Sequence, residues 1–234
     1  MRVNRPSMRS LGIGRVAGAL AITLSVGACS GSSWKEEVQL HDGQKIIIER
    51  SIERGGRSEI GQAPPIKEQR LSFQMPGADG KVEWFDKFSE DTGGANFLPM
   101  LLDIDKGVAY LVVYPMGCQS YNKWGRPNPP YVVFGYQANA WQRVPLEALP
   151  QSIKTPNLVF SNPDDTVQRL GARFVTAQMI QNIVKETSQA EYKTILRARM
   201  PEEMMCEKLE RYKGKWIRPG DPLAKQWVDS QEKK

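Results

Sequence analysis

The sequence predicts a mainly antiparallel β fold followed by a short α-helical C-terminal layer, an α+β protein. Short β-prone runs recur up to about residue 144, and turns rich in Gly, Pro, Asn and Asp separate them. Twelve of the 20 aromatic residues lie between residues 81 and 141, where we therefore expect the core. After about residue 163, apolar residues recur at helical spacing instead.

Four pairs of segments are expected to form β-hairpins. Asp42 and Gly43 stand between the first two, and Asp-Gly between β-prone runs favours a tight turn. Residues 109–114 are apolar on both faces, as expected of a central strand. The spacing indicates a sandwich, a barrel or a curled sheet. The four pairs are 34–40 with 45–50, 67–75 with 82–88, 97–104 with 108–114, and 131–136 with 141–144.

Three helical segments are expected in the C-terminal part. Residues 176–186 place four apolar side chains on one helical face. Residues 188–191 (Ser-Gln-Ala-Glu) have the pattern of a capping box, and Pro201 followed by two acids is typical of a helix start. Such short helices should pack on the sheet, because they are not stable alone. The polar residues 230–234 are expected to form a disordered tail.

Composition and charge exclude several classes of protein. A chain of 234 residues that is 40% hydrophobic and 25% charged is ordinary for one globular domain. The net charge of +6 falls to +2 without the four arginines of the first 28 residues, which removes the electrostatic case for binding nucleic acid. One histidine and three cysteines leave little material for zinc chemistry. We expect no metal and no cofactor.

The N-terminus has the pattern of an export signal. Residues 1–15 are basic and lack acids, and residues 16–28 are apolar or small. As a helix, the apolar stretch would span about 20 Å, too short for a hydrocarbon core of about 30 Å. It therefore indicates a cleaved signal peptide rather than a membrane span. An ordinary secreted protein cut after Ala28 is the alternative.

Residues 26–30 (Val-Gly-Ala-Cys-Ser) resemble the lipobox of bacterial lipoproteins, with Val26 where that pattern more often has leucine. The resemblance implies cleavage by type II signal peptidase and acylation of Cys29. More than one acyl chain suffices for stable attachment to a membrane. Ser30 resembles the second mature residue of the outer-membrane class. These features predict an outer-membrane lipoprotein that faces the periplasm.

The remaining cysteines are expected to form a disulfide. If Cys29 carries the lipid, Cys118 and Cys206 are left as a pair, and an oxidising compartment favours a bond between them. Two buried free thiols are the alternative. The expected organisation is a signal peptide at 1–28, a lipidated cysteine and spacer at 29–33, and one periplasmic domain at 34–229 with its helical part from about 163.

The most distinctive segment of the mature chain is 121–131. Its prolines favour an extended backbone, its aromatic side chains offer flat faces, and its amide and guanidinium groups offer hydrogen bonds. These groups suit sugar rings or a peptide strand. A rigid loop whose aromatic residues cover the core is the alternative. The candidate binding residues are Tyr121, Asn122, Trp124, Arg126, Asn128 and Tyr131.

Candidate catalytic groups are few. Asp103 and Asp105 lie two positions apart and hence on one face of a strand, where paired carboxylates could bind a cation or share acid/base work. A simple turn at 105–107 is the alternative. His41 is interpreted as a polar turn residue. The Asp-Thr-Gly triplet that begins at Asp91 matches aspartic proteases over three residues, which we attribute to chance.

Much of the mature chain resembles an uncharacterised family of Gram-negative bacteria that has no assigned activity. The resemblance therefore implies no catalytic residue. The expected role is non-catalytic, binding or structural support in the cell envelope, with the membrane and an envelope protein or glycan as partners. An envelope hydrolase that uses paired carboxylates and a subunit of an envelope assembly are the alternatives. The similar segments are 34–38, 41–43, 60–68, 121–130 and 191–196.

Overall fold

The fold is that of a computed structural model, which describes Met1 and residues 31–231 except 57, 59–61 and 78. The expected signal peptide, Cys29 and residues 232–234 lie outside the described residues. The protein is α+β and mainly β, with 37% strand against 23% helix and the helices toward the C-terminus. The predicted fold class is confirmed.

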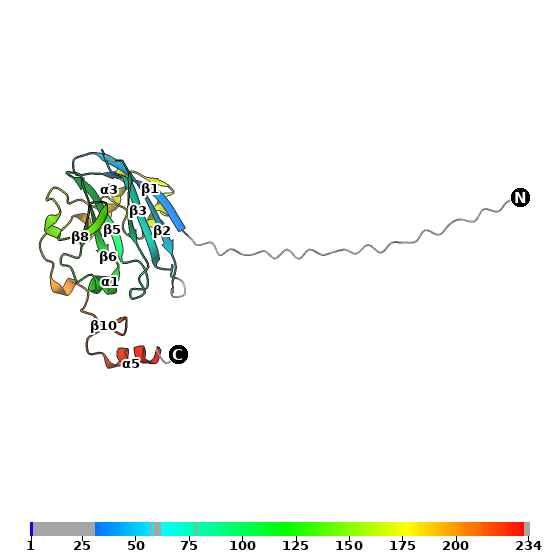
Figure 1. The fold of residues 1–234 in the computed structure, drawn as a ribbon, viewed down its shortest axis with the longest axis vertical. Coiled ribbons are helices and arrows are strands. Elements are labelled where there is room, and N and C mark those ends of the chain that lie inside the picture. The colour runs from blue at the N-terminus through cyan, green and yellow to red at the C-terminus, as the bar shows by residue number, and fades with distance from the viewer. Residues whose placement is uncertain (2–30, 57, 59–61, 78, 232–234) are drawn as a thin grey trace.

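The first sheet has five strands in the order β4-β3-β2-β1-β9 (Figure 1). Neighbouring strands are antiparallel, apart from β9, which lies parallel to β1. Gly43 in the β1–β2 turn has a φ of +89°, in the left-handed region that favours glycine. The strands are β1 (Gly31–Gln39), β2 (Lys45–Arg54), β3 (Ile66–Gln74), β4 (Lys81–Asp86) and β9 (Phe174–Val175).

The second sheet has four strands in sequence order, each antiparallel to the next. A register shift between Pro99 and Leu101 interrupts the pairing of its first strand. All four predicted hairpins are therefore confirmed. The strands are β5 (Phe97–Asp105), β6 (Val108–Pro115), β7 (Val132–Gln137) and β8 (Ala140–Val144).

The two sheets pack face to face and form the first two layers of the molecule. Inward and outward side chains alternate along the first sheet, and its outward face carries exposed ion pairs such as Lys45–Glu37. In the second sheet, β5 and β6 are buried on both faces, whereas the residues of β8 are exposed or partly buried. Leu111 and Val113 contact the first sheet, whereas Val112 contacts the C-terminal segments that form the third layer.

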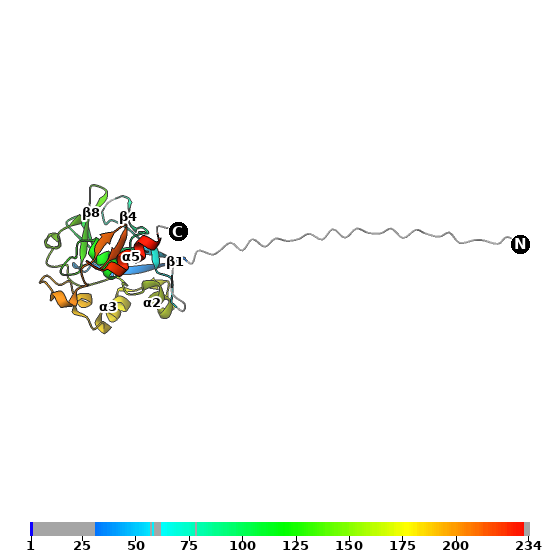
Figure 2. The same cartoon turned by 90° about the horizontal axis from the view of Figure 1, so that it is seen from below.

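The third layer consists of short helices and irregular chain. Figure 2, seen from below, places α2 and α3 away from β4 and β8, and both helices contact β1. A small hairpin and α5 lie below the sheets in Figure 1. The remaining elements are α1 (Gly117–Lys123), η1 (Leu146–Ala148), α2 (Pro163–Leu170), α3 (Ala177–Glu186), α4 (Ala190–Lys193), η2 (Glu202–Met204), β10 (Glu210–Tyr212), β11 (Lys215–Ile217) and α5 (Pro222–Gln231).

The predicted helix at 176–186 is confirmed, and the Thr176 hydroxyl caps it by accepting the N–H of Met179. The predicted capping box is wrong. Gln189 precedes α4 without a side-chain cap, and α4 ends after one turn because the N–H of Ile195 bonds the carbonyl of Lys154 instead. The helix expected after Pro201 is only the 3₁₀ turn η2.

Both ends of the described chain are more ordered than expected. The proposed spacer residues 31–33 belong to β1, because β2 continues far enough to pair with them. Ser230 and Gln231, expected in the disordered tail, are the last residues of α5. Sequence analysis also did not predict α1, α2, α5 or the β10–β11 hairpin.

A buried ion pair on the inner face of the first sheet holds the C-terminal chain. Glu36 and Arg50 are 0% and 2% exposed and lie 3.0 Å apart. The Glu36 carboxylate also accepts the N–H of Val159 at 3.1 Å, and Arg50 donates to the Val159 carbonyl. The two side chains thus satisfy both backbone groups of Val159, as a neighbouring strand would.

Asn157 makes the equivalent connection to the second sheet. Its side chain exchanges hydrogen bonds of 2.9 and 2.8 Å with the N–H and carbonyl of Leu102, next to the register shift of β5. The same amide donates to the carbonyl of Gln39 at the end of β1. Residues 157–159 therefore join the edges of both sheets.

We expect Arg50→Met to lower the free energy of unfolding by about 3–5 kcal/mol, because it leaves Glu36 buried without its cation. Urea denaturation followed by circular dichroism measures the change. Lys81→Met is the matched control, since Lys81 pairs with Glu49 on the exposed face and such pairs contribute little. Equal effects of the two substitutions would contradict this role of the buried pair.

Candidate functional site

Both tyrosines of segment 121–131 are built into the fold. Tyr121 and Tyr131 are 5% and 3% exposed, so neither ring is an open platform. The Tyr131 hydroxyl donates to the carbonyl of Glu191 at 2.7 Å, and burial raises the pKa of this phenol. Tyr131 lies in the core cluster that joins the second sheet to the C-terminal layer.

The polar residues of the segment bind the C-terminal chain. Asn122, Arg126 and Asn128 each form hydrogen bonds to backbone atoms within residues 200–209. Their amide and guanidinium groups are therefore engaged inside the molecule. For these three residues the structure agrees with the alternative interpretation of the segment, a rigid loop that belongs to the fold.

The predicted disulfide is confirmed. Cys118 on α1 and Cys206 are bonded, with 5.4 Å between their Cα atoms. The bond closes a loop across a sequence separation of 88 residues. In the loop-entropy account, such a closure stabilises the fold by about 4–5 kcal/mol. It also ties α1 to the chain that leads to the β10–β11 hairpin.

Asp91, in the Asp-Thr-Gly triplet, attaches that hairpin. It accepts hydrogen bonds from Lys123 at 2.9 Å and from the Trp216 indole at 3.3 Å, and Arg211 lies 3.8 Å away. Burial raises the pKa of Asp91, but hydrogen bonds from Ser89 and Lys123 outweigh burial and lower the pKa to about 2. The carboxylate therefore acts as a structural attachment point.

Trp124, which is only partly buried, lines a pocket of about 410 Å³. The walls come from β4, β5, β7, β8, α1 and the chain between β4 and β5. We call this cavity the aromatic pocket. Its aromatic lining residues are Trp84, Phe85, Phe88, Phe97, Trp124, Phe134 and Trp141.

The rings of the aromatic pocket form a tilted cluster. Phe97 is buried, and its centroid lies 4.6 Å from Trp124 and 5.6 Å from Phe134. The Trp141 indole donates to the carbonyl of Glu83 on the edge strand β4 at 2.9 Å. Trp124, Phe134 and Trp141 are partly buried: they pack on the core and also line the pocket.

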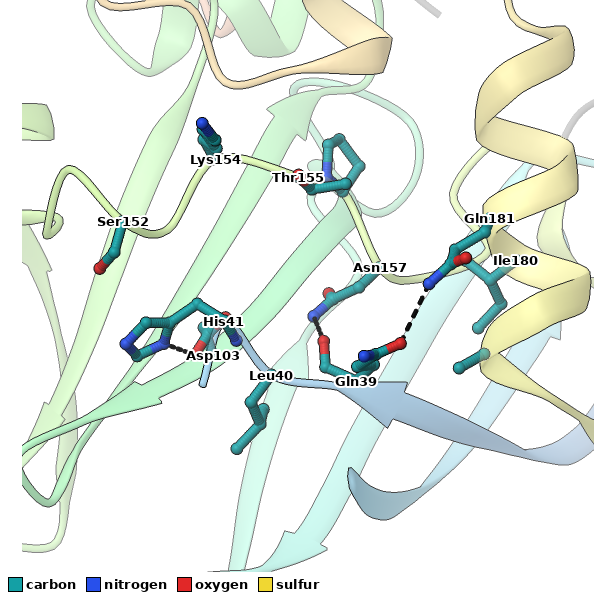
Figure 3. Close-up of a pocket in the computed structure, with 12 residues that line it drawn as sticks. Gln39, Leu40, His41, Asp103, Ser152, Lys154, Thr155, Asn157, Ile180 and Gln181 are labelled. Atoms are coloured by element: carbon teal, nitrogen blue, oxygen red, sulfur yellow. Dashed lines mark hydrogen bonds and ion pairs between the residues drawn. The ribbon is translucent and has the colours of Figure 1, made fainter. Parts of the chain in front are cut away.

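A second cavity, of about 290 Å³, lies between the β1–β2 turn, residues 152–157 and α3 (Figure 3). We call it the His41 cleft. Gln39 and Gln181 face each other across one end and share a hydrogen bond of 3.0 Å. The other polar lining residues are His41, Asp103, Ser152, Lys154, Thr155 and Asn157.

Asp103 holds the imidazole of His41. Its carboxylate lies 2.7 Å from Nδ1 of His41 and also accepts the backbone N–H of His41 at 2.9 Å. The Asp103 side chain is only 4% exposed. On the other side of the ring, Asp105 lies 3.7 Å from Nε2. The imidazole is therefore flanked by both carboxylates.

The pKa values of His41 and Asp103 are both raised above their ordinary values. The hydrogen bond that the imidazole donates to Asp103 raises the pKa of His41, and burial opposes that rise. Burial raises the pKa of Asp103, while its hydrogen bonds to His41 and to the N–H of Ile104 act in the opposite direction. A proton on Nδ1 directed at Asp103 leaves Nε2 available for proton transfer.

This arrangement bears on two predictions. Asp103 and Asp105 do not face each other as an open carboxylate pair, because the ring of His41 lies between them. His41 lies in the turn, as predicted, and Asp103 binds its ring. The sequence carries no signal of this pairing, since 62 positions separate His41 and Asp103.

No protein-family model, curated protein or solved structure matches this chain. The fold is a two-sheet sandwich with a third, C-terminal layer. Within the described residues, no cluster of His, Cys, Asp and Glu is large enough to hold a metal ion. In the same part of the chain, no helix has the length and hydropathy needed to cross a bilayer.

We expect the folded-state pKa of His41 to lie above the ordinary value of 6.5. A raised pKa contributes stability that is fully present below pH 6.5 and is lost as the pH rises through the folded-state pKa. Because the chain has one histidine, an NMR titration of the imidazole gives this pKa directly. Asp103→Asn should lower it, and a pKa below 6.5 in the unmodified protein would contradict the geometry.

Proposed function

We propose that the protein is a lipoprotein of the bacterial outer membrane, whose folded part is a non-catalytic binding module in the periplasm. The aromatic pocket is its contact site. The observation that carries this proposal is the set of partly buried rings, Trp124, Phe134 and Trp141, that line a concave surface. Such rings suit the flat face of a sugar or an apolar side chain, so the partner is a glycan or an envelope protein.

The lipid anchor is supported by the lipobox-like residues 26–30 and by the disulfide, which is typical of proteins outside the cytosol. β1 begins at Gly31, two positions after Cys29. Two residues extend at most about 7 Å. An acyl chain on Cys29 would therefore keep one end of the sandwich, the end at which β1 begins, close to the bilayer.

Cys29→Ala should move the protein from the membrane fraction to the soluble fraction, because it removes the acylation site. Cell fractionation with immunodetection measures the distribution. Cys118→Ala, which breaks only the disulfide, is the control and should leave the protein with the membrane. An unchanged distribution of the Cys29→Ala protein would contradict the anchor.

The binding role predicts position-specific crosslinking in intact cells. A photoreactive amino acid at Phe88, which lines the pocket and is 40% exposed, should capture envelope material that mass spectrometry identifies. Ile47 is the matched control, since it is 44% exposed on a strand outside both cavities. Trp141→Ala should reduce capture at position 88 about tenfold, because it removes a ring of the pocket.

Equal capture at positions 88 and 47, or capture that Trp141→Ala leaves unchanged, would contradict a binding role for the pocket. Trp141 is a better substitution than Trp124 for this test. The ring of Trp124 packs 4.6 Å from Phe97 and supports the core as well.

An envelope hydrolase remains the second candidate, and the His41 cleft favours it. Asp103 orients His41 there, as a buried carboxylate orients a catalytic imidazole. The position of His41 between both carboxylates argues against a mechanism that uses the two carboxylates alone. Glycan cleavage that is lost in His41→Gln and kept in Trp141→Ala would favour this hydrolase over the binding module.

The third candidate, a subunit of an envelope assembly, draws support from α5. Leu223 and Trp227 lie four positions apart on one helical face and are 75% and 57% exposed. Crosslinks from position 227 rather than from position 88 would favour this candidate.

A further inference from the structure

The charge around the aromatic pocket is positive. Lys87 lines the pocket, and its ammonium group lies 5.7 Å from the ring centroid of Phe85. Arg143 on β8 lines a neighbouring cavity of about 640 Å³ rather than the aromatic pocket itself, and its guanidinium group lies 5.9 Å from the ring centroid of Trp124, which lines the aromatic pocket. Neither cation has an ion-pair partner among the described residues. Both side chains belong to exposed residues and are available to a ligand.

The acidic groups near the pocket do not neutralise these two cations. Asp86 is the one acidic lining residue in the described chain, and it is 4% exposed. Its carboxylate accepts the backbone N–H groups of Asn96 and Phe97, and burial raises its pKa. Asp91, nearby, is already engaged with Lys123. On the outer face of the first sheet, by contrast, cations such as Lys81 and Arg70 are paired with glutamates.

The polar N–H groups at the ring edges of Trp141 and Trp124 already have partners within the protein. The indole N–H of Trp141 donates to the Glu83 carbonyl, and that of Trp124 points at the side-chain oxygen of Asn96 at 3.4 Å. What the two rings still offer a ligand is their apolar surface. A ligand that matches the pocket therefore combines a flat apolar ring face with a negative charge at its edge.

We propose that the aromatic pocket binds an acidic saccharide, a pyranose that carries a carboxylate. This inference rests on the proposed binding function. The sugar ring stacks on Trp124 and Trp141, and the carboxylate pairs with Arg143 and Lys87. A cation that lies over an aromatic ring is attracted to the ring face, which keeps its charge near the place where the carboxylate of a stacked sugar would lie.

Titration of the full-length lipidated protein in detergent tests this proposal. The probes are a hyaluronan tetrasaccharide, which contains uronic acids, and chitotetraose, which is neutral. Tryptophan fluorescence and calorimetry should show at least tenfold tighter binding of the acidic probe, and added salt should weaken that preference. The double substitution Lys87→Ala and Arg143→Ala should abolish the preference and leave the binding of chitotetraose unchanged, whereas Trp141→Ala should weaken both.

Lys81→Ala, which removes a cation paired with Glu49 on the outer face of the first sheet, is the control and should change neither affinity. Equal affinities for the two probes would contradict the preference for an acidic saccharide but would still agree with a module that binds saccharides. Absence of binding to both probes, with crosslinks from position 88 to a protein, would overturn the saccharide and retain the binding function. Absence of both binding and crosslinks would overturn the proposed function itself.

Discussion

The architecture depends on the peptide group of Val159, which the buried ion pair of Glu36 and Arg50 fixes against the first sheet. Two charges on the inner face of a sheet are costly unless polar partners surround them. The backbone of Val159 supplies those partners, and the charges in turn satisfy a backbone segment that belongs to no strand. Residues that follow this segment in sequence cover the outer face of the second sheet. The ion pair therefore sets the path of the third layer.

A two-sheet sandwich has two open sides, and the His41 cleft and the aromatic pocket lie at these two sides. Residues 157–159 close the side of β1 and β5, and the wall of the His41 cleft is the chain immediately before them. On the side of β4 and β8, which Figure 2 labels, aromatic residues from both sheets line the aromatic pocket. Trp124, Phe134 and Trp141 are only partly buried at this edge. The aromatic pocket is thus a consequence of how the sandwich closes.

The local patterns of the sequence predicted the hairpins, because each depends on neighbouring turn residues such as Asp42 and Gly43 and on alternation within a strand. They did not predict how short α4 is, since the N–H of Ile195 after it donates to the carbonyl of Lys154, which is far away in the chain. The same limit applies to the sites. Trp124 was identified from its local composition, but Trp141 and His41 gain their roles from residues 17 and 62 positions away. Pairing over such distances leaves no local signal.

The pocket and the C-terminal hairpin share one support, α1. Cys118 in α1 carries the disulfide, and Lys123 at its end binds Asp91, which also holds Trp216 of the hairpin. Trp124 follows Lys123 directly, so the position of its ring is set by both attachments. A ring fixed in this way loses little conformational entropy when a ligand stacks on it, and this favours affinity. The polar residues of segment 121–131 thus contribute to binding indirectly, because they hold the backbone that positions Trp124 at the aromatic pocket.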